Sequence, residues 1–530
     1  MIKRALIFGE GRINILLLII LFYVVGHLPF MFAPFVNLES WYAGAADLVS
    51  QGKVIAAAHF FEVTIANPIS SVFGIIPFYK LFGITEFSAR LFSLFCGGFA
   101  ILITYVMGKR YFSEHVAILA SLLVCFNPVF WLFSGLVFTD APFFFASSLA
   151  MFLFFFALEK DSFLLHFVSG IIFGLSFLLK MNAATFVPAI FIICILHVFS
   201  KRENLQEKFL SIAKLTFLYA AAIGVIFLPY IVWSFGNLGY LIPPAYQQGV
   251  GLTMPALFSN FLLKFSNFWG YVLWIGIFSG PIFLVIYYDL FKQFGVKKVL
   301  IYSIAGLILS FVLTFYMRES GELNLGWLKF FFNEIELFII SGILHFVGLL
   351  VVFGFFIQGI KSKSIVRYLA VWFFVVIISH SFVKVAAQRY LLFILLPLNL
   401  YLAKIVMQNM TNHLLRVVNY FIIVGSFIIF ISLDVFNSAY FAAEGYAAAD
   451  LAHFINKEQL KGIDPHPNHG ANPHSGYLIN KDLYVEGDER PKYITIIAGR
   501  KQRIDNMIKD FGVKPFGIII KRFVIIKNVE

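Results

Sequence analysis

The sequence predicts an all-α polytopic membrane protein with about 13 transmembrane helices, interfacial helices in the first outward loop and a small C-terminal α/β extracytoplasmic domain. Three observations lead to this fold class. Of the 530 residues, 60% are hydrophobic and 13% are charged, about half the charged fraction of a soluble domain. The apolar residues form runs of roughly the 20 residues that a helix needs to cross a bilayer. Basic residues recur in every second loop between these runs.

The first apolar run extends from Ile13 to about Phe35, after the basic start MIKRALIFGEGR. It is too long for the apolar region of a cleaved signal peptide and lacks a small-residue cleavage site, so it predicts a retained signal anchor. The following loop, 35–86, carries aromatic and small residues with few charges, as interfacial amphipathic helices do. Within it, Asn67 and Pro68 suit the start of a second such helix.

The later apolar runs have the length of membrane spans. Together with the first run they predict helices near 13–34, 87–108, 115–136, 141–158, 163–180, 183–200, 211–235, 268–290, 298–317, 335–358, 366–386, 390–408 and 415–435.

The basic loops orient these helices, because Lys and Arg in short loops resist translocation. With the N-terminus in the cytoplasm, the inward loops carry Lys109 and Arg110, Lys160, Lys201 and Arg202, Lys292, Lys297 and Lys298, Lys361, Lys363 and Arg367, and Arg416. An odd number of spans places residues 436–530 outside. We therefore expect a multi-pass protein of the plasma (inner) membrane, with a transmembrane domain at 1–435 and an extracytoplasmic accessory domain at 436–530.

The C-terminal segment has more charged residues and turn signals than the rest of the chain. Tyr446 to Leu460 predicts a helix, YITIIAG a strand, RIDNMIKDFG a helix and FGIIIKRFVIIKN a strand. Its loop contains His466, His469 and His474, but the spacing of a helical or hairpin metal site is absent. The three cysteines, Cys96, Cys125 and Cys194, lie inside apolar runs and predict neither a disulfide framework nor a thiolate site.

The formal net charge of +12 invites a comparison with nucleic-acid-binding proteins. The basic residues are spread over short loops, without the basic helix or aromatic-interleaved patch of such proteins, so no nucleic-acid partner is expected. Membrane lipids are the expected surroundings.

Two carboxylates lie at the outward ends of predicted spans. Glu39, in FVNLESWYAG, follows the first span, and Asp140, in VFTDAPFFF, precedes the fourth. An ionised group beside hydrocarbon is costly without a partner or a task. For Asp140 a helix cap is an equally good interpretation, since Thr139 or Asp140 before Pro142 suits that position.

Four cations lie at outward ends as well: Arg90 in FSARLFS, Lys180 in FLLKMNAATF, Lys384, and Arg389 in QRYLLFILLP. Each of them alone is better explained as a side chain that reaches the lipid headgroups. Because the predicted topology places them on the same side as Glu39 and Asp140, carboxylates and cations can meet around one outward cavity.

The sequence resembles the GT-C superfamily of membrane glycosyltransferases, in particular the lipid-carrier-dependent protein O-mannosyltransferases and the aminoarabinose transferases of lipid A. The resemblance rests on LESWYAG, NPISSVFGIIPFYKLFGITEFSARLFSLFCG, VFTDAP, LLKMNAATFVPA, LPYIVW and QRYLLFILLP. Relatives commonly have an acidic pair where this chain has Leu38 and Glu39, and a His-Pro-Pro-like stretch where it has Asn67, Pro68 and Ile69.

The resemblance implies transfer of a sugar from a polyprenyl-phosphate donor to an acceptor on the outer face, with inversion at the anomeric carbon. In this interpretation Glu39 is the general base and Asp140 orients the acceptor or the first loop. Lys180 and Arg389, followed by Arg90, are the expected ligands of the donor phosphate.

The acceptor or the pocket is expected to involve Trp41, Tyr42, Asn67 and Tyr390. No glycine-rich nucleotide loop is present, so no nucleotide cofactor is expected. The departures from the family pattern leave a divalent cation possible but unsupported.

Two alternatives remain open at this stage. A transporter or flippase of a lipid-linked intermediate would also need outward cations, although transporters concentrate polar groups near the middle of the membrane. An inactive GT-C-fold scaffold is the other alternative, because the acidic neighbour at position 38 is missing. The Glu39→Gln variant separates them: an enzyme loses transfer, whereas a transporter or scaffold is nearly indifferent. Neither the sugar nor the acceptor, which could be a protein, a lipid or a glycan, follows from the sequence.

Overall fold

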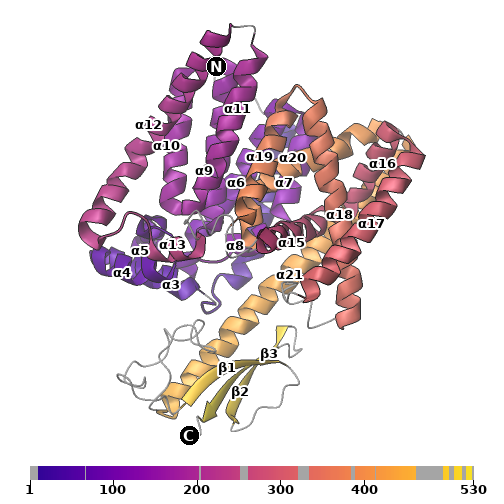
Figure 1. Ribbon diagram of the computed structural model, residues 1–530. Coiled ribbons are helices and arrows are strands. Elements are labelled where there is room, and N and C mark those ends of the chain that lie inside the picture. The colour runs from indigo at the N-terminus through magenta and orange to yellow at the C-terminus, as the bar shows by residue number, and fades with distance from the viewer. Residues whose placement is uncertain are drawn as a thin grey trace.

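The protein is described by a computed structural model over residues 10–36, 38–65, 67–201, 204–250, 261–319, 333–382, 388–411, 413–460, 493–499, 507–515 and 521–527 (Figure 1). The helices of its first half are α2 (Glu10–His27), α3 (Glu39–Ser50), α4 (Val54–Thr64), α5 (Ile76–Phe82), α6 (Glu86–Tyr111), α7 (Glu114–Cys125), α8 (Pro128–Ser134), α9 (Asp140–Lys160), α10 (Phe163–Leu179), α11 (Val187–Ser200), α12 (Leu205–Leu238) and α13 (Pro244–Val250).

The second half contains α15 (Phe261–Ser279), α16 (Phe283–Phe294), α17 (Val296–Glu319), α18 (Glu334–Lys361), α19 (Ile365–Ser381), α20 (Leu392–Gln408) and α21 (His413–Lys457). Three strands follow: β1 (Tyr493–Gly499), β2 (Met507–Val513) and β3 (Lys521–Lys527). Short 3-10 turns connect several helices, including η1 (Leu28–Phe30), η2 (Ile69–Ile75), η3 (Met181–Phe186), η4 (Gly280–Ile282), η6 (Gln388–Leu391) and η7 (Asn409–Thr411).

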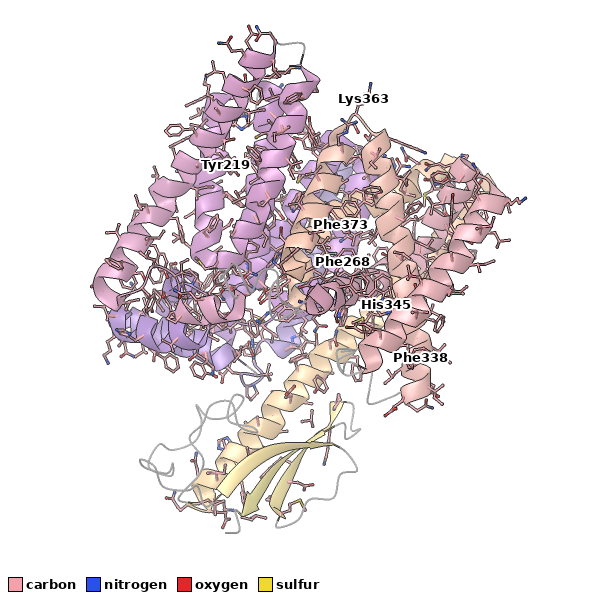
Figure 2. All side chains as sticks on the ribbon, viewed as in Figure 1. Tyr219, Phe268, Phe338, His345, Lys363 and Phe373 are labelled. Atoms are coloured by element: carbon pink, nitrogen blue, oxygen red, sulfur yellow. The ribbon has the colours of Figure 1, made fainter. Side chains whose placement is uncertain are left out.

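Many helices begin at polar caps that the sequence supplies. Thr85 accepts the backbone N–H of Ser88 at the start of α6, and Asn204 and Glu207 form a capping box at the start of α12. Within the helices, apolar side chains fill the bundle, as shown in Figure 2. These features make the chain an all-α polytopic membrane protein with the small C-terminal sheet as its exception.

Nine helices of the described residues are long and apolar enough to cross a membrane, and counting each bent helix pair as one span gives up to 11. Three shorter apolar helices, including Phe163–Leu179 and Ile365–Ser381, add to these. The predicted count of about thirteen therefore stays a prediction. The pair α7 and α8 bends by 64° at Phe126 and Asn127, within a segment expected to be one span.

The first long loop, expected on the outward side, forms helices, as expected, and α3, α4 and α5 lie across one end of the bundle (Figure 1). The C-terminal sheet lies toward the same end, whereas Lys363 marks the opposite end (Figure 2). Helix α21 joins the sheet to the bundle. Lys109 and Arg110, expected in the first inward loop, lie in the last turn of α6.

The C-terminal region differs from its expected pattern in two places. Helix α21 continues without a break from His413 to Lys457, because the alanine-rich run after Asn437 favours the helix. Gly445 allows this helix to lie close to the loop after α2, since an added Cβ would be 2.5 Å from the Pro34 carbonyl oxygen.

The helix expected at RIDNMIKDFG is wrong over Met507–Val513, which forms strand β2. The antiparallel sheet has the order β1-β3-β2. Its central strand, β3, is therefore paired with β1 on one edge and with β2 on the other. Phe511 pairs with Phe523 of β3 and packs against Phe454 of α21, with ring centroids 5.8 Å apart. Strand pairing and packing on α21 outweigh the local helical preference.

Candidate functional site

Glu39 is the first residue of α3, and both of its carboxylate oxygens are occupied. Oε1 accepts from Arg90 Nε at 2.9 Å and from the backbone N–H of Val137 at 2.8 Å. Oε2 accepts from Arg90 Nη2 at 2.7 Å and from the backbone N–H of Val36 at 2.9 Å. The residue is completely buried. Since a carboxylate offers about four acceptor positions, Glu39 has none left for another donor.

Arg90, on α6, contacts both Glu39 and the loop after α2. Besides the pair with Glu39, its guanidinium donates to the carbonyl oxygens of the loop after α2, those of Phe30, Met31, Ala33 and Pro34. Predicted as a phosphate ligand, Arg90 instead ties this loop to α3 and α6. Through these contacts Glu39 and Arg90 join the loop after α2 to α3 and α6.

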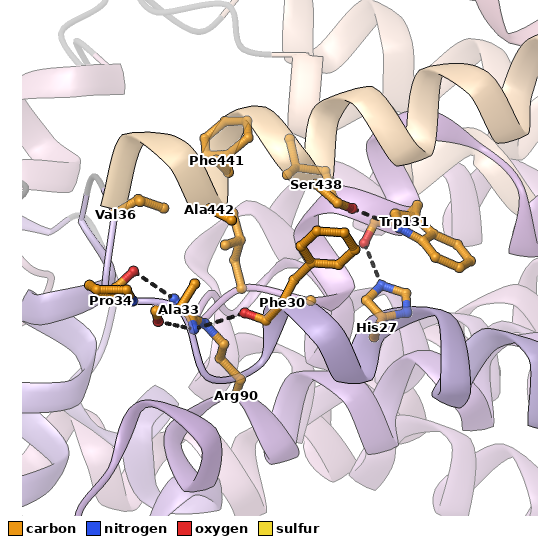
Figure 3. A pocket seen from close by; sticks show the side chains of 13 residues that line it. His27, Phe30, Ala33, Pro34, Val36, Arg90, Trp131, Ser438, Phe441 and Ala442 are labelled. Carbon is orange, nitrogen blue, oxygen red and sulfur yellow. Dashed lines mark hydrogen bonds between the residues drawn. The ribbon is translucent and has the colours of Figure 1, made fainter. Parts of the chain in front are cut away.

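A pocket lies between this loop and α21 (Figure 3). Arg90, His27, Trp131 and Ser438 are among its lining residues. Their polar atoms already have partners: Trp131 Nε1 donates to Ser438 Oγ at 3.1 Å, and both ring nitrogens of His27 contact backbone carbonyl oxygens. The pocket therefore offers little free hydrogen-bonding capacity.

A second ion pair joins Asp140 to Lys180. Asp140 is the first residue of α9, and Lys180 lies in the turn that follows α10. Lys180 Nζ donates to Asp140 Oδ1 at 2.5 Å, and both side chains are buried. The second oxygen of Asp140, Oδ2, is buried without a hydrogen-bond partner among the described residues.

Arg389 and Tyr390, in η6, bring another cation to this pair. The Lys180 ammonium lies 5.2 Å from the centre of the Tyr390 ring, and the Arg389 guanidinium lies 5.8 Å from the centre of the same ring. Arg389 also lies over Phe138, at 5.7 Å. Its Nε is buried and lacks a hydrogen-bond partner within the described ranges.

Burial and charge set the protonation of Lys180. Desolvation lowers its pKa from 10.5 to about 8, with the nearby Arg389 contributing in the same direction and Asp140 opposing the shift. We refer to Asp140, Lys180, Arg389 and Tyr390 as the Asp140 cluster. It contains two cations and one carboxylate, and two of its polar atoms have no described partner, so its charge is not balanced from within.

Asn67 and Tyr42 form a hydrogen-bonded border of this cluster. Asn67 Nδ2 donates to the Tyr42 hydroxyl at 2.9 Å and to Thr139 Oγ1 at 3.2 Å, next to Asp140. Burial raises the pKa of Tyr42 to about 12, so its hydroxyl stays protonated. Trp41 stacks on Phe60 instead, with ring centroids 4.6 Å apart, and its expected pocket role stays a prediction.

The structure adds two residues that the sequence pattern did not single out as site residues. His380 Nε2 lies 3.4 Å from Asn182 Nδ2, and the His380 ring lies 5.4 Å from that of Tyr390. Asn182 lies two residues after Lys180, in the stretch KMNAATF. This nearness to Lys180 is the one sequence signal that could have identified Asn182. His380, Tyr390 and Tyr271, with apolar residues around them, line a gap that is too narrow to hold a water molecule.

Within the described ranges, no group of three or more His, Cys, Asp or Glu side chains is placed to hold a metal ion. His466, His469 and His474 lie outside the described residues. The expectation that no metal is required stays untested.

Residues 67–233 match the family model described as dolichyl-phosphate-mannose-protein mannosyltransferase, so this segment is similar to polyprenyl-phosphate-sugar-dependent glycosyltransferases of the GT-C kind, as predicted. The matched segment contains Asn67, Arg90, Asp140 and Lys180, whereas Glu39 and Arg389 lie outside it. Among curated proteins, an uncharacterized protein of Aquifex aeolicus is 25% identical over 203 residues. That match spans 38% of this chain and 40% of the relative's length.

Two solved structures are similar over most of this chain. The crystal structure of ArnT from Cupriavidus metallidurans bound to undecaprenyl phosphate has 13% identity and a TM-score of 0.43, covering 95% of this chain and 97% of that one. The archaeal oligosaccharyltransferase AglB from Archaeoglobus fulgidus, in complex with an inhibitory peptide and a dolichol-phosphate, has 15% identity and a TM-score of 0.47. Its match covers 91% of this chain and 61% of that one.

Proposed function

We propose that this membrane protein transfers a sugar from a polyprenyl-phosphate donor to an acceptor on its extracytoplasmic face, with inversion at the anomeric carbon. The single observation that carries the proposal is the unbalanced charge of the Asp140 cluster. Leaving a buried cation without a counterion is costly, so a site with two cations and one carboxylate is suited to an additional anion. The donor phosphate supplies that anion.

In this proposal Lys180 and Arg389 hold the donor phosphate. As the bond between the anomeric carbon and the phosphate oxygen breaks, negative charge grows on the leaving polyprenyl phosphate. Cations already in place stabilise this transition state more than the ground state. Arg389 offers a fork of donors and Lys180 a compact charge, and the aromatic face of Tyr390 lies beside both.

The acceptor must lose a proton as its oxygen attacks the anomeric carbon. The contacts favour Asp140 for this step, because its Oδ2 has no described partner. Glu39, expected from the sequence to be the base, accepts four hydrogen bonds and is completely buried. We therefore assign Glu39 and Arg90 to the positioning of the outward loop, and Tyr42 and Asn67 to the acceptor side of the site.

The proposal also sets the orientation. The Asp140 cluster faces the extracytoplasmic side of the plasma membrane, the N-terminus is cytoplasmic, and residues 436–530 form an outward accessory domain. This arrangement fits Figure 1, in which α3 to α5 and the C-terminal sheet lie toward the same end of the helices. The acceptor can be a protein, a lipid or a glycan, and no step requires a metal.

Replacing Arg389 by Gln tests the phosphate site directly. We expect affinity for undecaprenyl phosphate to fall by about 10- to 100-fold, as for the loss of a hydrogen bond from a charged group, with affinity for undecaprenol unchanged. Binding to both lipids is measured on purified protein in nanodiscs. Arg110→Gln is the matched control, because Arg110 pairs with exposed Glu159 at the other end of the bundle. Equal loss for phosphate and alcohol would contradict the proposal.

Donor binding is also expected to depend on pH through Lys180. Its pKa is lowered to about 8, so the side chain is charged below that pH and loses its proton as the pH rises through it. Affinity of the ligand-free protein for undecaprenyl phosphate should therefore decrease between roughly pH 7 and 9. Lys180→Arg should remove this decrease, since arginine keeps its charge over the range. A decrease that persists unchanged in Lys180→Arg would assign it to another group.

A further inference from the structure

Glu62, in α4, is a buried carboxylate that the proposed reaction does not use. Its Oε1 accepts the backbone N–H of Ile69 at 2.6 Å, and the Tyr230 hydroxyl lies 3.2 Å from Oε1 and 3.1 Å from Oε2. Among the described residues no cation pairs with it, and its exposed fraction is 0%. A buried carboxylate held only by neutral donors is costly, so a function at this position would account for it.

The segment that Glu62 holds, residues 67–70, connects to both partners of the Asp140–Lys180 ion pair. At one end Asn67 donates to Thr139, the residue before Asp140. At the other end Ser70 Oγ donates to the carbonyl oxygen of Leu178 at 2.8 Å, two residues before Lys180.

The contact from Glu62 to Ile69 lies between these two ends. Helix α12 enters the same arrangement through Tyr230, 168 residues away from Glu62 along the chain. One carboxylate thus anchors the strip of chain that spans the beginning of α9 and the end of α10. A shift of this strip would change the separation of Asp140 and Lys180.

We propose that Glu62 is a positioning residue of the phosphate site: through segment 67–70 it holds Asp140 and Lys180 in the geometry that recognises a phosphate. This inference rests on the proposed function, since it needs a phosphate to bind at the Asp140 cluster. Glu62 itself contacts neither lipid nor acceptor. Its contribution is preorganisation, because small displacements of binding groups have large effects on recognition.

The test separates positioning from general stability by comparing a charged lipid with its uncharged counterpart. Affinities for undecaprenyl phosphate and undecaprenol are measured in nanodiscs for the wild type, Glu62→Gln and Tyr230→Phe. We expect the ratio of the two affinities to fall on the order of 10-fold in both variants, with affinity for undecaprenol unchanged. If Glu62 had a purely structural role, the variants would weaken the binding of both lipids alike.

Tyr219→Phe is the matched control, because Tyr219 is another buried tyrosine of α12 (Figure 2). The partner of its hydroxyl is Ser169 Oγ, at 3.1 Å, rather than Glu62. Its affinity ratio should equal that of the wild type. A wild-type ratio that is retained in Glu62→Gln and Tyr230→Phe overturns the positioning role alone. A wild type without preference for the phosphate overturns the proposed function, and the inference about Glu62 with it.

Discussion

Asp140→Asn is expected to lower sugar transfer by about 10²- to 10⁴-fold, the contribution typical of a general base. Asparagine keeps the shape of the side chain and an oxygen that can accept from Lys180, but it cannot take a proton from the acceptor. Donor binding should therefore persist. Transfer is measured with a polyprenyl-phosphate sugar and the acceptors found by comparing surface glycans and lipids of cells with and without the protein.

Two comparisons make this result decisive. Asp47→Asn removes a carboxylate on the surface of α3 that accepts a hydrogen bond from Gln51, and it should leave transfer unchanged. Glu39→Gln is the second comparison. If Asp140→Asn keeps full activity while a folded Glu39→Gln protein loses it, the base is Glu39, as the sequence pattern alone suggested. Full transfer in both variants would assign the base to another residue, and a wild type without any transfer would favour a transporter or an inactive scaffold.

The general architecture could be predicted from the sequence because it depends on local properties. Apolar runs of spanning length give helices in a membrane wherever they occur, since backbone polar groups must be satisfied internally. The helices between Glu39 and Phe82 were also predicted, from the apolar and aromatic composition of that loop. Strand β2 could not be predicted in this way, because its conformation depends on pairing with β3 and packing on α21.

The site could be predicted only as a set of residue types on one side of the membrane. Which carboxylate meets which cation depends on how α3, α6, α9 and α10 pack, and no local pattern records it. Arg90 illustrates this limit: its position at an outward helix end resembles that of Lys180, yet it pairs with Glu39 and four backbone carbonyls. Glu62 had no sequence signal, because its partner Tyr230 lies on a helix distant in the chain.

The largest effect on stability is expected at the pair between Glu39 and Arg90. Glu39→Gln leaves the buried guanidinium of Arg90 without its countercharge, which typically costs about 3–5 kcal/mol of unfolding free energy. Removing both charges, in Glu39→Gln with Arg90→Met, should cost less than the sum of the two single variants, since no lone charge remains buried. Unfolding of the purified proteins in detergent, followed by denaturant titration, gives the free energies for this cycle.

The exposed pair of Arg110 and Glu159 provides the scale for comparison. Its nitrogen and oxygen are 2.6 Å apart, as close as in the buried pair, but 24% and 42% of the two side chains are exposed. Water screens such a pair, so Glu159→Gln should change the unfolding free energy by no more than about 1 kcal/mol. If the two pairs differ in cost despite their similar distances, burial rather than distance makes Glu39 indispensable to the loop between α2 and α3. A Glu39→Gln protein as stable as Glu159→Gln would instead remove the positioning role and return Glu39 to consideration as the base.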